Sequence, residues 1–335
     1  MFEFPLLLVL IVIVALVFDF TNGAHDCANA IATVVSTKAL SPRAAVLMAA
    51  VLNFLGALLG EEVAQTLGSG IVNPAVVADS HILVLAALIG AIAWNLITWH
   101  YGIPSSSSHA LIGGLIGAAV AHAGFNTLNG ASILKKVLIP LVCSPLAGFA
   151  TGFLLMGLIT VCLCRFNRTK VNRVFFKLQI VSSAFMATSH GLNDAQKPMG
   201  VITLALLIFG QIHTVHVPIW VKLSCALAMA AGTAVGGWKI IKTMGHRIFK
   251  LEPVHGFAAE SSAAFVITGA SLLGAPISTT HTITSCIFGV GSTKRLSAVR
   301  WGVAGHLVTA WILTLPASAA ISAAAFLALS AFAAG

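Results

Sequence analysis

NGAHDCANA, residues 22–30, and HGLNDAQK, residues 190–197, are two polar stretches that interrupt an otherwise very apolar chain. Each contains a glycine three residues before an aspartate, Asp26 in the first stretch and Asp194 in the second, and 168 residues separate the two aspartates. Polar residues and glycine that interrupt apolar segments at matching places in two halves of a chain mark the binding sites of duplicated membrane proteins. The two stretches therefore predict a chain built from two copies of one membrane unit.

A second pair of motifs recurs in the same order. PSSSSH occupies residues 104–109 and PISTTH occupies residues 276–281, and 172 residues separate their histidines. Proline disrupts a helix interior, because it lacks the backbone N–H and clashes with the preceding turn. We therefore expect two helical hairpins, one broken at Pro104 and the other at Pro276.

The composition indicates a membrane protein. Of the 335 residues, 58 % are hydrophobic and 8 % are charged, whereas soluble domains carry about 25 % charged residues. We predict an all-α polytopic protein of the cell (inner) membrane. Six cysteines without metal-ligand spacing give no reason to expect a metalloenzyme. Apolar stretches near or above the ~20 residues that cross a bilayer lie at 4–37, 44–60, 82–98, 132–164, 178–210, 218–241, 257–273 and 301–332.

Loop charges predict how the two copies are oriented. The segment 165–177 carries five basic residues, and Lys and Arg are enriched in cytoplasmic loops. The net charge of +9 is therefore a sign of membrane orientation and not of nucleic-acid binding. We expect one repeat at 1–164, a basic cytoplasmic linker at 165–177 and a second repeat at 178–335. Each repeat crosses the membrane an odd number of times, so the second should be inverted relative to the first.

The first apolar run is expected to stay in the membrane. A secretory signal peptide begins with basic residues and ends at a small-residue cleavage site. Here Glu3 stands at the start, and no such cleavage site separates the run from Asp26. We therefore interpret this run as the first membrane segment.

The two aspartates are the strongest candidates for a functional site. A carboxylate inside a membrane segment costs about 3 kcal/mol on insertion scales and needs a compensating partner. A structural hydrogen bond at a kink is one explanation, but recurrence in both copies favours a cation or proton site. Unwound carbonyls and Asn amides suit a small cation, so we expect discontinuous helices at 23–29 and 191–198. The flanking candidates are Asn22, His25, Asn29, His190, Asn193 and Gln196.

The hydroxyl runs suit an anion. A proline followed by Ser or Thr is a good start for a helix, and a helix N-terminus offers free N–H groups and partial positive charge. Two such starts converging at mid-membrane would form a donor-rich pocket, unless each hydroxyl bonds to its own helix instead. His109 and His281 could donate to an oxyanion or carry a proton. The hydroxyl candidates are Ser105, Ser106, Ser107, Ser108, Ser278, Thr279 and Thr280.

Two more charged residues have open roles. Lys197 could neutralise the substrate or the Asp194 site, or it could extend its ammonium group to the membrane interface. Glu260, just before the second hairpin, is a candidate proton or cation residue. We expect no cofactor and no metal other than Na⁺ at Asp26 and Asp194.

Taken together, these motifs resemble those of the inorganic phosphate transporter (PiT) family over essentially the whole chain. The resemblance implies inverted repeats, broken helices, re-entrant hairpins, usually a homodimer, and phosphate uptake driven by a cation gradient. It also implies a compact prokaryotic member, because the long central loop of animal relatives is missing. Carried over by motif, the cation or proton residues would be Asp26, Asn29, Asn193 and Asp194. The phosphate residues would be Ser105, Ser106, Ser107, Ser278, Thr279 and Thr280.

The resemblance leaves the coupling ion and the substrate open. His25 stands where many sodium-coupled relatives have Asn, so we favour a proton slightly over sodium. A symporter of sulfate or another oxyanion is the main alternative, because hydroxyl and amide donors fit any tetrahedral oxyanion. An anion channel would not need paired carboxylates, and an intramembrane enzyme is the weakest alternative.

Overall fold

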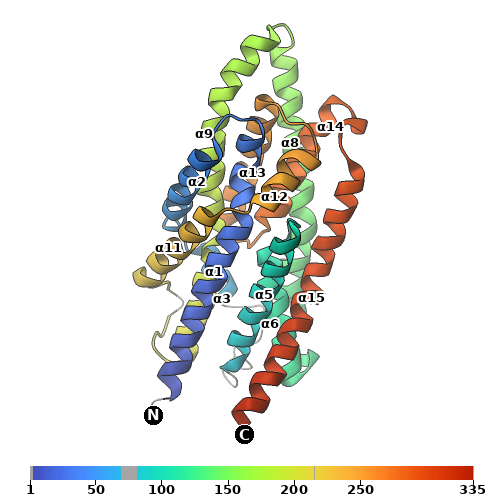
Figure 1. Ribbon diagram of the computed structural model, residues 1–335. Coiled ribbons are helices and arrows are strands. Elements are labelled where there is room, and N and C mark those ends of the chain that lie inside the picture. The colour runs from blue at the N-terminus through green and yellow to red at the C-terminus, as the bar shows by residue number, and fades with distance from the viewer. Residues whose placement is uncertain (1–2, 69–80, 215, 335) are drawn as a thin grey trace.

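The computed structural model describes residues 3–68, 81–214 and 216–334, and this part of the chain is helical without a β-strand (Figure 1). The first half contains α1 (Glu3–Ser36), α2 (Pro42–Ala57), α3 (Glu62–Gly68), α5 (Ile82–Tyr101), α6 (Ser107–Ala123), α7 (Gly130–Ile133) and α8 (Ile139–Leu163). The second half contains α9 (Arg168–Asp194), α10 (Gln196–Ile208), α11 (Ile219–Val235), α12 (Trp238–Lys242), α13 (Pro253–Leu272), α14 (Thr279–Lys294) and α15 (Trp301–Ala334).

Several of these helices can cross a bilayer. Among the described residues, four are long and apolar enough, within α1, α5, α8 and α15. A fifth span results if α11 and the helical segment Trp238–Arg247, bent by 62° relative to it, are counted together. Helices α2 and α6 are apolar but shorter. The chain is therefore a multi-pass membrane protein.

The two hairpins break where the sequence predicts. Helix α5 ends at Tyr101 and α6 begins at Ser107, so Pro104 lies in the nonhelical connection. Helix α13 ends at Leu272 and α14 begins at Thr279, so Pro276 lies in the equivalent connection. The local chemistry of proline and hydroxyl residues decides both breaks.

The prediction of a discontinuous first helix is wrong. Helix α1 runs without interruption through residues 23–29. Gly23 has a packing role instead, because a Cβ atom there would lie 2.4 Å from the carbonyl oxygen of Met229 on α11. The missing side chain lets α1 and α11 approach closely, as small residues do between membrane helices.

The corresponding break in the second half is present but small. Only Ala195 separates α9 from α10, and its backbone is right-handed helical at φ −67° and ψ −23°. Its amide still donates to the carbonyl of Gly191 over 3.3 Å. The backbone at 191–198 is therefore interrupted at one residue and not unwound.

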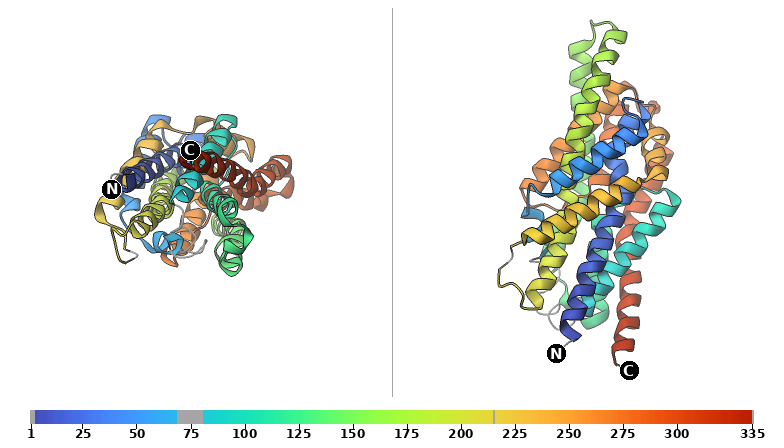
Figure 2. Two further views of the ribbon diagram at one scale, coloured as in Figure 1. Left: turned by 90° about the horizontal axis from the view of Figure 1, so that it is seen from below. Right: turned by 60° about the vertical axis from the view of Figure 1, so that its left-hand side comes forward.

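The two halves interlock. Helix α6 packs against α15, and α14 packs against α8, so the second arm of each hairpin contacts the last long helix of the other half. Helix α1 packs on α11 and α2 packs on α9. Both chain ends lie at the same end of the molecule (Figures 1 and 2). The centre of the bundle is therefore built from both halves.

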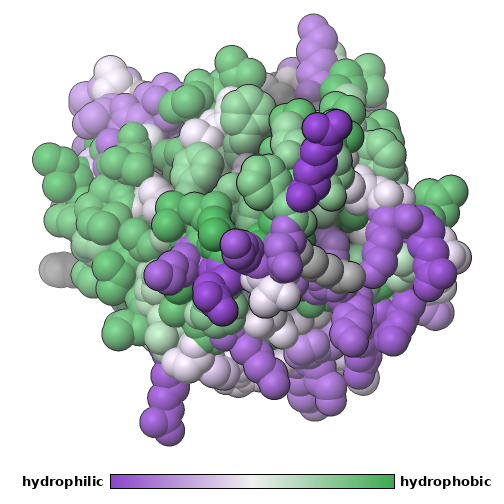
Figure 3. All heavy atoms as spheres, turned by 90° about the horizontal axis from the view of Figure 1, so that it is seen from above, coloured by the Kyte–Doolittle hydropathy of each residue, from purple (hydrophilic) through white to green (hydrophobic). Residues whose placement is uncertain are grey.

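The basic segment at 165–177 lies at the opposite end of the molecule, around the α8–α9 connection (Figure 1). Most of it is helical, because α9 already begins at Arg168, and the side chain of Asn167 accepts from the amide of Thr169 at the helix start. Lys170, Arg173 and Lys177 are exposed, and hydrophilic residues gather on parts of the surface at this end (Figure 3). Its cytoplasmic placement stays a prediction.

Candidate functional site

The two aspartates that lie 168 residues apart in sequence meet inside the bundle. Asp26 on α1 is 2 % exposed and Asp194 at the end of α9 is fully buried. Ligand atoms of Asp26, Asp194 and His190 all lie within 4.8 Å of one another. These three side chains are suitably grouped to hold a cation.

Hydroxyls of both hairpins reach Asp26. Ser107 on α6 donates to Oδ2 over 3.3 Å, and Thr280 on α14 donates to Oδ1 over 3.4 Å. The Nδ1 atom of His25 lies 2.5 Å from Oδ1. Asp26 is therefore bound by residues of three helices from both halves.

His25 connects Asp26 with the first hairpin. Its Nε2 atom lies 3.1 Å from the hydroxyl of Thr98 and 3.4 Å from that of Ser105. Ser105 in turn donates to Thr98 over 2.9 Å. A change of charge on His25 would therefore be felt by both Asp26 and the start of the first hydroxyl run.

Asp194 is bound on both oxygens. The ammonium group of Lys197 donates to Oδ1. Thr279 on α14 donates to Oδ2 over 2.9 Å, and Nε2 of His190 lies 3.1 Å from the same oxygen. The second aspartate therefore has a fixed cationic partner, unlike Asp26.

Two asparagines complete this network. Asn29 donates to the hydroxyls of both Thr279 and Thr280, over 3.2 and 3.0 Å. Because these two hydroxyls donate to different aspartates, Asn29 links the two acidic centres. When the Asn193 amide is oriented to accept from Ser271, its nitrogen lies 3.3 Å from Oδ1 of Asp194.

The residues of the hydroxyl runs fall into three groups. Ser106 and Ser278 are helix caps, because their hydroxyls accept from the amides of His109 and His281 over 3.2 Å each. Ser108 donates to the carbonyl of Ile277. Ser105, Ser107, Thr279 and Thr280 instead contact the Asp and His residues described above. Local bonding thus accounts for the two caps, whereas Ser105, Ser107, Thr279 and Thr280 are the hydroxyls that line the candidate site.

His109 and His281 face one another and not the aspartates. Their ring centroids are 5.0 Å apart, and the His281 ring stacks on Trp311 with centroids 4.1 Å apart. In the part of the chain that is described, no hydrogen-bond partner is found for Nδ1 of either ring. The two histidines therefore join the hairpins at their helix starts.

Gln196 lies outside the network. Its carbonyl oxygen accepts from the amides of Val63 and Ala64, over 2.7 and 3.2 Å, and its nitrogen donates to the carbonyl of Leu192. It therefore accepts from the free backbone amides at the start of α3, and its side-chain oxygen is not available to bind a cation.

Replacing Gln196 with Leu is expected to destabilise the protein and leave its ion dependence unchanged. The change deprives two buried amides of their acceptor, which costs about 1–3 kcal/mol per unsatisfied group. Thermal unfolding in detergent measures the loss, with Gln65→Leu on the same short helix as the control. A changed ion dependence of uptake at unchanged stability would instead make Gln196 a cation ligand.

One buried acid escaped the sequence analysis. Asp19 on α1 is fully buried, and neither its carboxylate nor the amide of buried Asn22 has a hydrogen-bond partner among the described residues. Asp19, Asn22 and Asp26 recur at i, i+3 and i+7, which places them on one face of a helix. That spacing could have identified Asp19 as part of a polar stripe leading to Asp26.

Glu260 belongs to a separate cluster. The hydroxyls of Thr33 and Ser182 both donate to its carboxylate, and the amide of Gln179 donates over 3.5 Å. The residue is fully buried on α13. Its role in moving a proton or cation stays a prediction.

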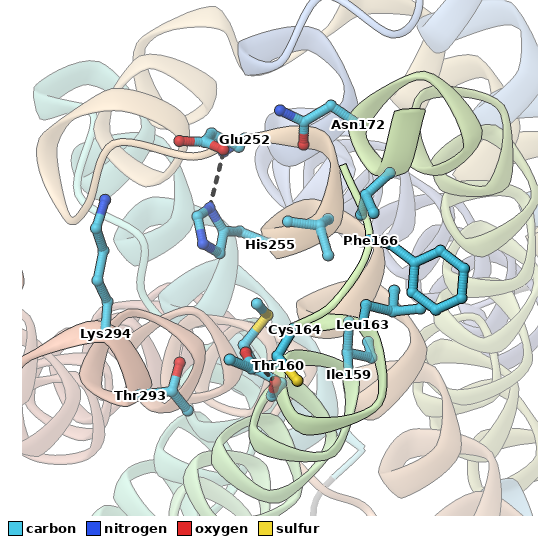
Figure 4. Close-up of a pocket in the computed structure, with 13 residues that line it drawn as sticks. Ile159, Thr160, Leu163, Cys164, Phe166, Asn172, Glu252, His255, Thr293 and Lys294 are labelled. Carbon is cyan, nitrogen blue, oxygen red and sulfur yellow. Dashed lines mark hydrogen bonds between the residues drawn. The ribbon is translucent and has the colours of Figure 1, made fainter. Parts of the chain in front are cut away.

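A cavity of about 370 Å³ lies away from these motifs. It is lined by residues of α8, α9, α13 and α14, and Figure 4 shows Glu252, His255 and Lys294 among them. The amide of Glu252 donates to Nδ1 of His255 over 3.1 Å. None of the predicted site residues lines this cavity, whereas the motif residues themselves are enclosed by the bundle.

A charged and hydroxyl-rich centre, buried where two sets of apolar helices interlock, defines a membrane transport protein. The sequence profile described as the Phosphate transporter family matches this chain twice, at residues 22–169 and 163–322. The chain belongs to this family of transporters, which are not enzymes.

Known proteins resemble this chain over nearly its full length. The chain is 49 % identical over 327 residues to the "Probable low-affinity inorganic phosphate transporter" of Bacillus subtilis (strain 168), with 97 % of this chain and 98 % of the relative covered. Identity to the protein of the same description in Rhizobium meliloti (strain 1021) is also 49 %, with 97 % of each covered. A solved structure described as "The sodium-dependent phosphate transporter" matches with a TM-score of 0.88 at 28 % identity, covering 97 % of this chain and 99 % of that one.

Proposed function

We propose that the protein is a secondary active symporter that imports inorganic phosphate and is driven by a cation gradient. One observation carries this proposal: hydroxyls of both hairpins, Ser107 on α6 and Thr280 on α14, converge on the same carboxylate, Asp26. Helix starts with free N–H groups and hydroxyls bind oxyanions, and the adjacent carboxylate binds a cation. An anion site and a cation site thus share atoms.

The contacts between hydroxyls and carboxylates explain how cation binding and phosphate binding are coupled. The hydroxyls of Ser107, Thr279 and Thr280 donate to the aspartates. A cation that takes over the carboxylate oxygens frees these hydroxyls to donate to phosphate. Each ligand therefore raises the affinity for the other, and this effect is reciprocal by thermodynamic necessity. Ser105, Ser106 and Ser278 complete the proposed phosphate contacts from the two helix starts.

The coupling ion is proposed to be a proton, with sodium as the alternative. The imidazole of His25 lies 2.5 Å from Asp26, where it can exchange a proton with the carboxylate. The cluster of Asp26, Asp194 and His190 supports the sodium alternative, as does the description of the solved relative as sodium-dependent. Asn22, Asn29 and Asn193 are the amides proposed to assist either ion.

We also propose that the halves are inverted repeats. Two features support this: α1 and α9 run in opposite directions along the molecule, as do α8 and α15 (Figure 1), and each hairpin packs on the last helix of the other half. Alternating access would then arise from one set of helices moving against the other around the fixed site. A homodimer, which the resemblance implies, stays a prediction.

Uptake of labelled phosphate into proteoliposomes tests the function. We expect accumulation under an inward proton gradient, and under a sodium gradient only if sodium is the coupling ion. Excess sulfate should compete weakly, because phosphate has a protonated oxygen that can donate to a carboxylate and sulfate has none. Equal competition would favour the general oxyanion symporter, and currents far above carrier rates without coupling would favour a channel.

A further inference from the structure

Lys197 occupies a position that distinguishes the two halves. Asn29 follows Asp26 by three residues, and Lys197 follows Asp194 by three residues. The second half therefore has an ammonium group where the first half has an amide. Residues at i and i+3 of a helix lie on one face, and the structure joins Lys197 directly to Asp194.

The lysine does not extend to the membrane interface. A snorkelling lysine keeps its ammonium group in water, but Lys197 is 1 % exposed and is among the largest fully buried side chains. Its charge is thus placed against a buried carboxylate, that of Asp194.

With Lys197 in this position, both carboxylate oxygens of Asp194 have partners. One oxygen accepts from Lys197, and the other contacts Thr279 and His190. Asp26 receives two hydroxyls and an imidazole but contacts no lysine or arginine among the described residues. A monovalent cation can therefore displace neutral donors at Asp26, whereas at Asp194 it would have to displace a fixed positive charge.

We propose that Lys197 is a tethered counter-cation, which takes at Asp194 the place of a free coupling cation, so that Asp26 alone holds an exchangeable ion. The proposal deepens the symport function and rests on it. It names Lys197 as the residue that sets how many coupling ions the carrier binds. Replacing Lys197 with Asn, the residue at the equivalent place in the first half, should create a second cation site.

The test measures Na⁺ binding without transport. Purified protein in detergent is heated in NaCl or in choline chloride of equal ionic strength, and the melting temperature is recorded. Lys197→Asn should gain a Na⁺-dependent rise of several degrees over the wild type, because a ligand that binds only the folded state stabilises it. The double variant Asp194→Asn with Lys197→Asn should lose this gain, and Lys197→Arg should not acquire it.

A matched control removes a lysine elsewhere. Lys222 on α11 lies 2.8 Å from Glu61 in a partly exposed ion pair, so Lys222→Asn should respond to the two salts as the wild type does. The proposal is overturned if Lys197→Asn responds to Na⁺ as the wild type does, or if the gain persists without Asp194. It is also overturned if Lys197→Asn is unstable in both salts while the double variant is stable, because Na⁺ then cannot replace the ammonium group.

The result of this melting test can be distinguished from a failure of the proposed symport function. A wild-type protein that fails to accumulate phosphate in proteoliposomes contradicts symport. The Na⁺ response of Lys197→Asn depends only on folded protein and on Asp194, so it is read from the melting curves whatever the transport result.

Discussion

Replacing Asp26 with Asn is expected to lower the rate of phosphate uptake into proteoliposomes by about a hundredfold or more. The carboxylate accepts from Ser107 and Thr280 and lies against His25. Truncating one partner of a buried charge pair costs about 2–5 kcal/mol of binding free energy, and each 1.4 kcal/mol is a factor of ten in affinity, so the variant should bind the coupling cation far more weakly. The asparagine keeps the size of the side chain but loses the negative charge that we propose to hold the cation.

Initial uptake rates under an imposed ion gradient measure this effect. Glu61→Gln is the matched control, since it makes the same chemical change in a partly exposed carboxylate that pairs with Lys222. The control should transport close to the wild-type rate. Wild-type uptake with unchanged gradient dependence in the Asp26→Asn protein would remove Asp26 from the coupling site.

Replacing Gly191 with Ala is expected to cost about 1–3 kcal/mol of stability, or more if the backbone cannot shift. The added Cβ would lie 2.2 Å from the carbonyl oxygen of Asn53 on α2. No side-chain rotation can relieve a contact with backbone, so α2 and α9 would have to separate. Because His190 and Asp194 lie on the same stretch of α9, uptake should fall as well.

Thermal unfolding in detergent measures the loss at Gly191. Gly157→Ala on α8 is the matched control, because a Cβ there has no heavy atom within 4 Å. The control should melt at or slightly above the wild-type temperature, since alanine favours a helix by about 1 kcal/mol over glycine. Equal melting temperatures for the two variants would show that the α2–α9 contact tolerates separation.

The sequence was sufficient where local chemistry decides the structure. Proline and hydroxyl residues determine both hairpin breaks, and charge inside apolar segments identifies the aspartates, whatever their distant neighbours are. The sequence failed where a distant partner decides. Gly23 suggested an unwound helix, but the close approach of α1 to α11 accounts for this glycine. Gln196 resembled a cation ligand in the sequence, but in the structure it accepts from the amide of Val63 on α3.

Fixed charge pairs were equally hard to predict. Lys197 could be interpreted as an interfacial lysine because the sequence does not give the depth of its ammonium group. Asp19 lies outside the repeated motifs, and only its helical spacing connects it to Asp26. The burial of both residues follows only from the packing of α1, α9 and α10.

The packing of α6 against α15 means that α6 lacks its partner helix for part of biosynthesis. Small residues allow the two helices to approach closely, since a Cβ on Gly117 would lie 2.0 Å from the carbonyl oxygen of Ala319. The ribosome finishes α6 at Ala123 but does not begin α15 until Trp301. At roughly 5–20 residues per second, the glycine face of α6 waits about ten to forty seconds for its partner. During this interval the nascent chain must be shielded by lipid, by the insertion machinery or by a chaperone.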